Sequence, residues 1–285
     1  MSRSYDSGIS IPADSFIDLQ THTHLSDGKW MPEALIEYFV TEDFATAAIT
    51  DHDRIDTMAD VQRIARERGF PLLVATEMTT QWRGQTVDIL CFGFEGDLTP
   101  LQELCDAIRA AQSDNTRQVY EYLVGHGFIP EHDEEELKSV LKETTAMQPI
   151  VIVDVFVKYN PDPKDYTPLR DAGYTLCANP TKDVVKAVHQ CGGVALIAHP
   201  GRTDGFATFD SDLLDQFCSE VPVDGIEVYY PHHTPEQVAL YQVYAQQHGW
   251  LISAGSDSHK PEQPPIKYRA DQCVALLARL DIEVL

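Results

Sequence analysis

The chain has 285 residues and carries 21 Lys and Arg against 45 Asp and Glu, which gives a formal charge of −24. Its 43% hydrophobic and 23% charged residues are typical of a globular protein, and its length suits one large α/β domain or one domain with an insertion. So acidic a surface repels polyphosphate, so duplex nucleic acid is not an expected partner. No apolar run approaches the roughly 20 residues that a membrane helix needs, so we expect no membrane partner.

Residues 1–15 and the cysteines indicate the cellular compartment. Residues 1–15 lack the apolar stretch of a secretory signal, and the six cysteines form no C-x-x-C pair. A disulfide framework or a zinc–thiolate site is therefore not expected. We expect a cytoplasmic protein with buried, reduced cysteines, and the sequence leaves its oligomeric state open.

Seven short apolar runs predict buried strands. They cover residues 16–19, 46–50, 71–76, 86–94, 193–199, 225–230 and 250–256. Helical patterns lie between several of them, at 32–43, 57–69 and 234–249. This alternation predicts a βα barrel or a doubly wound parallel sheet. Residues 78–85 are too few for a crossover helix and predict a hairpin, which makes the third and fourth strands antiparallel neighbours.

The alternation of strand and helix patterns stops between residues 98 and 185. Helical patterns dominate over 99–127 and 131–144, and a Pro- and Asp-rich stretch follows at 158–174. We therefore predict a helical insertion at 98–185, with a long irregular loop, between two parts of one α/β domain at 1–97 and 186–285.

Potential metal ligands follow five of the predicted strands. Seven residues at these strand ends are His, Asp or Glu: His22, Asp27, His52, Glu77, His199, Asp257 and His259. In a βα barrel the carboxyl ends of the strands share one face, where active sites form. His and carboxylate side chains gathered there suit Zn²⁺, Mn²⁺ or Fe²⁺. One such residue would be weak evidence, but five ligand-bearing strand ends predict a metal site.

Several motifs then resemble the PHP (polymerase and histidinol phosphatase) family. The stretches DLQTHTHLSDG, ITDHD, LLVATEMT, LIAHPGR, GIEVYYP and SAGSDSH occur in that order between Ile17 and His259. The resemblance implies a distorted (βα)₇ TIM-like barrel with two or three divalent metal ions that hydrolyses phosphoesters. The helical insertion resembles the small lid domain of the stand-alone phosphoesterase branch. That branch includes phosphatases of nucleoside 3′,5′-bisphosphates and 5′→3′ exonucleases acting on short RNA.

The resemblance also implies three ligand sets. One ion would take Asp27, His52 and His259. A second would take His22, Glu77 and Asp257. A third would take Glu77 and His199.

This sequence departs from the family pattern at two positions. Gln20 stands where the family has the first His of its H-x-H, so either its amide oxygen is a ligand or its site is weakened. His24, at a variable family position, is either a further ligand or an exposed loop residue. Asp88 stands where the family usually has His, and a carboxylate there favours Mn²⁺ or Mg²⁺ over Zn²⁺.

Hydrolysis of a phosphate ester needs a nucleophile and neutralisation of charge, and adjacent divalent ions supply both. We expect a metal-activated water to attack phosphorus, with Asp257 or His259 assisting proton transfer. Arg202 is the first candidate to bind the substrate phosphate and assist catalysis, followed by Arg117 and Lys260. Each of these cations could instead be an ordinary surface charge.

The leading hypothesis is a metal-dependent phosphoesterase acting on a small phosphorylated compound, with a nucleotide as the first candidate. The alternatives are a 5′→3′ exonuclease of short RNA and a non-catalytic domain that binds metal or nucleotide. A metal-dependent amidohydrolase would share the barrel, although its usual metal-bridging Lys is not apparent. Glu227 either supports a metal ligand or simply faces the barrel interior.

Overall fold

The structure, a computed structural model, describes residues 8–161 and 165–285. The chain divides into two compact units, which are described separately. The first comprises the chain up to Glu103 together with Asn179–Leu285, and the second comprises Leu104–Ala178. The domain bounds expected from the sequence stay a prediction.

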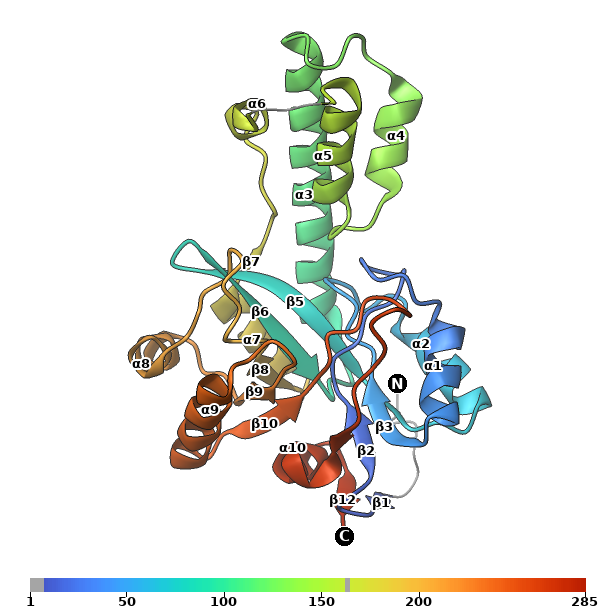
Figure 1. Ribbon diagram of the computed structural model, residues 1–285, viewed down its shortest axis with the longest axis vertical. Helices are drawn as coiled ribbons and strands as arrows, with labels where there is room; N and C mark the ends of the chain where they lie inside the picture. Colours follow the sequence, from blue (N-terminus) through green and yellow to red (C-terminus); the bar gives the residue numbers. More distant parts are fainter. Residues whose placement is uncertain (1–7, 162–164) are drawn as a thin grey trace. The chain divides into compact units, whose positions relative to one another are not determined.

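The described residues of the first unit form three sheets (Figure 1). The largest has the strand order β10-β9-β8-β6-β5-β7, with strands at Leu251–Ala254, Gly225–Tyr229, Val194–Ile197, Gln85–Phe92, Ala75–Trp82 and Asn179–Pro180. The second has the order β11-β2-β3-β4, with strands at Tyr268–Arg269, Phe16–Asp18, Phe44–Ala48 and Leu72–Leu73. A two-stranded sheet joins β1 (Ile9–Ile11) to β12 (Ile282–Val284) near the chain ends.

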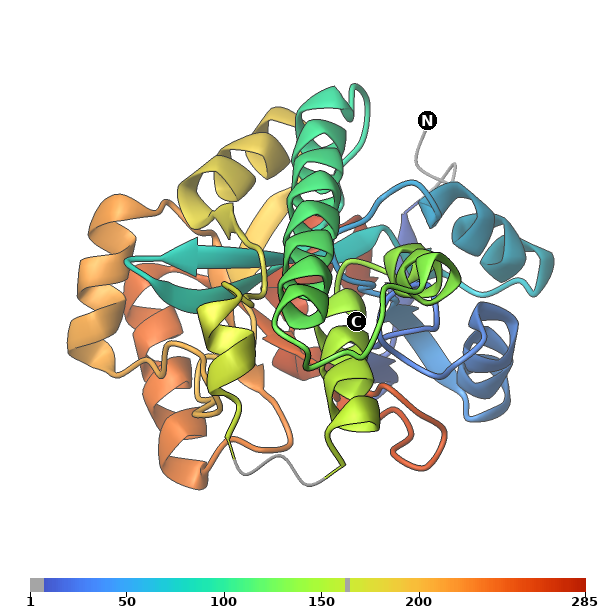
Figure 2. The same cartoon turned by 90° about the horizontal axis from the view of Figure 1, so that it is seen from above.

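Helices cover these sheets. Figures 1 and 2 show α1 and α2 beside β2 and β3, and α8 and α9 at the other side of the unit. These and the remaining helices of the unit are Pro32–Thr41 (α1), Met58–Glu67 (α2), Thr181–Gln190 (α7), Ser211–Glu220 (α8), Pro235–His248 (α9) and Val274–Arg279 (α10), with a 3-10 turn (η1) at Ala270–Gln272. The three helices predicted between the strands are confirmed as α1, α2 and α9.

The ends of α9 follow from its sequence. Thr234 and Gln237 form a capping box at the start, and Pro235 occupies the first turn. The helix ends at Gly249, whose φ of 66° is left-handed.

The predicted hairpin is confirmed, because β5 and β6 pair antiparallel from Ala75↔Phe92 to Trp82↔Gln85. Its turn is shorter than expected. Only Arg83 and Gly84 lie outside the ladder, with φ of 49° and 82°, and two positive φ values in a two-residue turn match the twist of the flanking strands. The predicted strand at 71–76 is divided, since β4 pairs with β3 whereas β5 begins at Ala75.

The α/β class with parallel strands is confirmed, but a closed barrel is not. The pairing gives three separate sheets, with antiparallel pairs at β5–β6, β6–β8 and β11–β2. Contacts beyond the strand ends link the two larger sheets. Leu19 N–H donates to the carbonyl of Ala254 at 2.9 Å, and single bridges join Thr21 to Ser258 and His52 to Glu77. The ladder stops because β2 is only three residues long and the chain then turns into the loop that carries His22 and Asp27.

Two apolar clusters hold the first unit together. One lies among β2, β6, β8, β10 and α10 and includes Ile17, Phe92, Leu196, Ala254 and Leu277. The other packs α1 and α2 against β3 and includes Leu35, Phe39, Ala47, Val61 and Phe70. Burial of about 25 cal/mol per Å² of apolar surface makes such clusters the main stabilising contribution.

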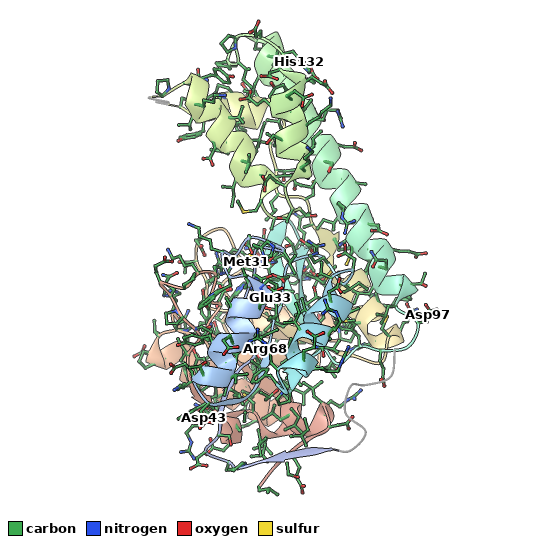
Figure 3. All side chains as sticks on the ribbon, turned by 90° about the vertical axis from the view of Figure 1, so that its right-hand side faces the viewer. Met31, Glu33, Asp43, Arg68, Asp97 and His132 are labelled. Carbon is green, nitrogen blue, oxygen red and sulfur yellow. The ribbon has the colours of Figure 1, made fainter. Side chains whose placement is uncertain are left out.

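The second unit is helical. Its helices are α3 (Thr99–Gly125), which begins in the first unit, α4 (Glu134–Lys142), α5 (Gln148–Tyr159) and α6 (Thr167–Asp171). Asp97, labelled in Figure 3, accepts the N–H of Thr99 at 3.0 Å where α3 starts, and Asp133 caps α4 by accepting the N–H groups of Glu135 and Glu136. The helical character predicted for this segment is confirmed. The predicted irregular stretch at 158–174 contains α6, and residues 162–164 lie outside the described chain.

No helix among the described residues has the length and apolar composition needed to cross a membrane.

Candidate metal centre

Most of the predicted ligands lie just after strands of the two larger sheets, whereas Glu77, expected at a strand end, lies within one. His22 and Asp27 follow β2, His52 follows β3, His199 follows β8, and the segment with Asp257 and His259 follows β10. Glu77 and Asp88 lie on β5 and β6 themselves. Three groups of these side chains bring ligand atoms within 4.8 Å of one another.

The first group combines His22, Asp27, His52 and His259. Oδ2 of Asp27 lies 3.3 Å from Nε2 of His259 and 3.8 Å from Nε2 of His52. The His22 ring stacks between the other two imidazoles, with centroid distances of 4.8 Å to His52 and 4.2 Å to His259. Three imidazoles and one carboxylate therefore converge.

The second group is His22, Glu77 and Asp257. Nε2 of His22 lies 3.1 Å from Oε2 of Glu77 and 3.1 Å from Oδ1 of Asp257. These approaches lack hydrogen-bond geometry, so both ring nitrogens of the fully buried His22 are left without a hydrogen-bond partner. A buried imidazole nitrogen facing two carboxylate oxygens is the arrangement expected around a cation.

The third group is His52, Glu77 and Asp88. The resemblance implied Glu77 and His199 for a third ion, and Nε2 of His199 does lie 3.0 Å from Oε1 of Glu77. Asp88, already a candidate ligand from the sequence, lies beside this pair: its Oδ2 is 3.8 Å from the same nitrogen, and its Oδ1 is buried without a hydrogen-bond partner. Glu77 thus belongs to both the second and the third group, as a carboxylate shared by two ions would.

The electrostatics of the centre also fit a cluster of cations. Burial by itself would raise the pKa of Glu77 and Asp27, but the imidazoles outweigh it and hold the pKa of both carboxyls well below the ordinary range. For Asp88, burial and the charge of Glu77 outweigh the opposing charge of Arg202 and raise the pKa well above the ordinary value. A cation beside Asp88 would offset the free-energy cost of ionising its buried carboxyl. The residues present therefore fit divalent ions.

The loop after β2 is held by one carboxylate. Asp51 accepts the N–H and the hydroxyl of Thr23, both at 2.7 Å, and the hydroxyl of Ser26 at 2.8 Å. All three residues are buried. This network places Asp27, the next residue, against His52 and His259.

Strained backbone occurs at the centre. His199 and Asp257 have φ of 27° and 55°, a region that non-glycine residues rarely adopt. Each lies at a turn that follows a strand. Positive φ at two predicted ligands shows that the surrounding structure imposes these turns.

Two of the predicted ligands occupy different surroundings. His24 is exposed and belongs to none of the three groups, which matches the alternative of a loop residue. Gln20 is fully buried, and its Nε2 donates to Oε2 of Glu77 at 2.7 Å. The nitrogen of the amide, rather than its oxygen, therefore faces the centre.

The three candidate phosphate-binding cations differ in placement. Arg202 packs 4.0 Å above the Phe206 ring and pairs with Asp204 at 2.7 Å. Burial lowers the pKa of Arg202, but the hydrogen bond to Asp204 and nearby charges, among them that of Asp257, outweigh burial and raise it. Lys260 directly follows His259, whereas Arg117 is exposed on α3 in the second unit.

One buried carboxylate was missed from the sequence. Asp18 is fully buried at the end of β2 and accepts the N–H of Ser256 at 3.0 Å and that of Ile266 at 2.8 Å. Burial raises its pKa to about 7. Its contacts join β2 to the segment that carries Asp257. An Asp inside the apolar run FIDL was the available signal.

Comparison with known proteins finds relatives over most of the chain. It is 28% identical over 256 residues to a 3′,5′-nucleoside bisphosphate phosphatase of Chromobacterium violaceum, covering 86% of this chain and 87% of that protein. It is 27% identical over 264 residues to the 5′-3′ exoribonuclease Rnm of Escherichia coli, covering 86% and 85%. It is 25% identical over 256 residues to a phosphoribosyl 1,2-cyclic phosphate 1,2-diphosphodiesterase of Eggerthella lenta, covering 85% and 93%. No family model matches the chain.

These relatives support the resemblance to PHP-type phosphoesterases. Two solved structures share the fold, each with a TM-score of 0.73. One is described as an amidohydrolase from Chromobacterium violaceum with bound sulfate and no metal, at 25% identity over 93% of this chain and 97% of that one. The other is assigned as a metal-dependent phosphoesterase from Bifidobacterium adolescentis, at 26% identity over 94% and 98%.

Proposed function

We propose that the chain is a metal-dependent phosphoesterase that hydrolyses a phosphate monoester of a small nucleotide. The observation that carries the proposal is that three groups of converging ligand atoms share residues: His22 belongs to the first and second groups, and the buried Glu77 to the second and third. The enzyme class agrees with the relatives, which are named as a phosphatase, an exoribonuclease and a phosphodiesterase.

The proposed ligands are the three groups together with His199, and two or three divalent ions would occupy them. When bound, such ions polarise phosphoryl oxygens and lower the pKa of water. Zn²⁺, Fe²⁺, Mn²⁺ and Mg²⁺ all remain candidates, and Asp88 favours the harder Mn²⁺ or Mg²⁺ at the third group.

Arg202 would bind the phosphate, because its guanidinium is already oriented. Asp204 bonds to Nε and Nη2 at 2.9 and 2.7 Å, and the Phe206 ring supports the flat face. The remaining N–H groups can donate to phosphoryl oxygens. Lys260 and Arg117 are secondary candidates for the same role.

The proposed proton acceptor is Asp257. Its Oδ2 lies 3.5 Å from the hydroxyl of Tyr230, while its Oδ1 faces His22 at 3.1 Å. Oδ2 is therefore available to take a proton from an attacking water. His259 is the alternative, and its Nδ1 is held at 2.8 Å from the backbone carbonyl of Asp257.

Hydrolysis of short RNA from its 5′ end is the second candidate function. The similarity to the exoribonuclease Rnm over 86% of this chain favours it. The formal charge of −24 favours the smaller substrate, because each additional phosphate increases electrostatic repulsion.

The test compares three substrates with the ion-loaded protein: adenosine 3′,5′-bisphosphate, a 5′-phosphorylated RNA trinucleotide and p-nitrophenyl phosphate. We expect fastest release of phosphate from the bisphosphate, and loss of activity with EDTA that added Mn²⁺ restores. His199→Ala should lose activity, whereas His248→Ala, at an exposed histidine of α9, should keep it. Two or more bound ions without turnover of any substrate would contradict the proposal and favour a binding domain.

A further inference from the structure

Two fully buried polar side chains next to the candidate metal centre belong to none of the three ligand groups. They are Gln20, after β2, and Glu227, on β9. Each has one polar atom with a short contact to a proposed ligand and a second, buried atom, Oε1 in both cases, without a hydrogen-bond partner. Burying such groups is costly unless they have a specific role.

Gln20 contacts the side chain of Glu77. Its Nε2 donates to Oε2 of Glu77 at 2.7 Å, while Nε2 of His199 lies 3.0 Å from Oε1 of the same carboxylate. Exchanging the nitrogen and oxygen of the Gln20 amide would place two acceptor oxygens 2.7 Å apart, so the donor orientation is favoured. The rotation of the carboxylate is therefore restrained at both oxygens.

Glu227 contacts the backbone of His199. Its Oε2 accepts the N–H of His199 at 2.9 Å, at the residue whose φ of 27° is unfavourable for a side chain. The preceding N–H, of Ala198, bonds to the carbonyl of Asp88 as a continuation of the sheet. Where the strand ends and the chain turns, the acceptor of the next backbone N–H is therefore the side chain of Glu227 instead of a backbone carbonyl.

Gly255 lets both side chains approach the same backbone. A Cβ at this position would lie 2.4 Å from Cβ of Gln20 and 2.6 Å from Oε1 of Glu227, closer than real contacts allow. The two residues come from distant parts of the chain, yet they pack against one glycine. Gln20 and Glu227 therefore lie next to each other, and each contacts one proposed ligand, Glu77 or His199.

We propose that Gln20 and Glu227 are positioning residues, with Gln20 orienting the carboxylate of Glu77 and Glu227 holding the turn that aims His199 at that carboxylate. The proposal rests on the proposed function in that it takes Glu77 and His199 as ion ligands. It assigns Gln20 a supporting contact, whereas the sequence left open whether its amide oxygen is a ligand or its site is weakened. Such supporting contacts typically change ion affinity about 10- to 100-fold.

The test measures Mn²⁺ affinity by titration with electron paramagnetic resonance, and the number of bound ions by elemental analysis. Gln20→Ala should bind the same number of ions about 10- to 100-fold more weakly. Gln20→Glu separates the two roles, because a carboxylate facing Oε2 of Glu77 weakens binding if Gln20 is a donor and preserves or strengthens it if Gln20 is a ligand. Equal or tighter binding by Gln20→Glu, or loss of one ion in Gln20→Ala, would overturn the proposal.

The Glu227 variants test the second contact. Glu227→Gln keeps an acceptor for the N–H of His199 and should keep wild-type affinity, whereas Glu227→Met fills a similar volume without an acceptor and should bind about 10- to 100-fold more weakly. Equal affinity of the two variants would overturn the role of Glu227. If Glu227→Met does not fold, Glu227→Gln decides this role, and ion affinity below that of the wild type would overturn it.

Gln62→Ala is the matched control. Gln62 is a buried glutamine whose Nε2 donates to the carbonyl of Leu72 at 3.0 Å, away from the centre. Its variant should lose thermal stability and keep ion affinity. Because the measurement is ion binding, a protein that binds ions without hydrolysing any substrate would refute the proposed function and leave this inference intact.

Discussion

Glu77 is the residue on which the candidate centre depends most. It is fully buried, and it contacts the side chains of Gln20, His22 and His199. A buried carboxylate is tolerated only where cationic or donor groups surround it. Removal of any one partner therefore affects the others, and single substitutions here will not have additive effects.

Arg202 offers a prediction about substrate binding. Arg202→Ala should lower kcat/KM about 10- to 100-fold, mainly through KM, because a charge-assisted hydrogen bond to phosphate contributes about 1.5–3 kcal/mol. Steady-state kinetics with a nucleotide substrate measure this. Arg63→Ala, on an exposed arginine of α2, should change neither parameter. Unchanged KM in Arg202→Ala would remove this residue from the phosphate site.

His233 offers a prediction about pH. Burial lowers its pKa to about 4, and its Nε2 accepts the N–H of Gly201 at 3.1 Å, which only the neutral ring can do. The unfolded chain, with an ordinary His pKa near 6.5, binds a proton first as the pH falls. The contribution of His233 to the free energy of unfolding is therefore fully present above about pH 6.5. It is lost as the pH falls towards 4, by up to about 1.4 kcal/mol per pH unit. Urea unfolding at a series of pH values in this range measures the free energy of unfolding. That free energy should fall less steeply with falling pH in His233→Gln than in the wild type.

At the scale of elements, the loop after β2 shows how the fold positions ligands. The loop follows a strand of only three residues. Asp51, from the segment after β3, holds the loop by accepting hydrogen bonds from Thr23 and Ser26. Packing of α1 against β3 supports the same region. The loop is thus held by a residue of the neighbouring strand connection in addition to its own hydrogen bonds, such as that from the N–H of Gly28 to the carbonyl of Thr23 at 2.9 Å.

Asp51→Ala should therefore destabilise the protein strongly. Two donors of Thr23 and the hydroxyl of Ser26 would lose their acceptor in a buried site, at a cost of about 3 kcal/mol. Chemical denaturation of the ion-free protein measures the change. Asp60→Ala, at an exposed carboxylate of α2, should stay within about 0.5 kcal/mol of the wild type. A similarly small effect for Asp51→Ala would show that the loop is held by other contacts.

At the scale of the whole molecule, charge controls encounter with the substrate. A formal charge of −24 repels an anionic nucleotide at long range. Binding therefore depends on local positive charge from Arg202 and from bound cations, which reverses the field only at short distance. Salt screens the long-range repulsion and leaves the short-range attraction largely intact.

The association rate constant of a nucleotide should therefore rise with ionic strength. Between 10 mM and 150 mM salt the Debye length shrinks from about 30 Å to about 8 Å, so we expect the rate to increase several-fold. Stopped-flow fluorescence with a labelled nucleotide measures it, and the uncharged nucleoside should show no such dependence. A rate that falls with salt would mean that a positive patch steers the substrate.

Much of the candidate site could be predicted from the sequence. His22, Asp27, His52, Glu77, His199, Asp257 and His259 were expected at strand ends, and the structure brings them together. The hairpin and the main helices were also expected, because spacing of apolar residues and terminal residues such as Thr234 and Gly249 act locally.

The rest depends on residues that meet only after folding. Three features depend on partners more than 50 positions away in the chain, such as Gly255 and Ser256. They are the amide atom of Gln20 that faces Glu77, the burial of Asp18, and the place where the sheet pairing of β2 ends. Local pattern places a side chain on a strand or in a turn, because backbone geometry repeats over a few residues. Its partners and its solvation are set by packing between distant segments, and these control hydrogen-bond direction and pKa.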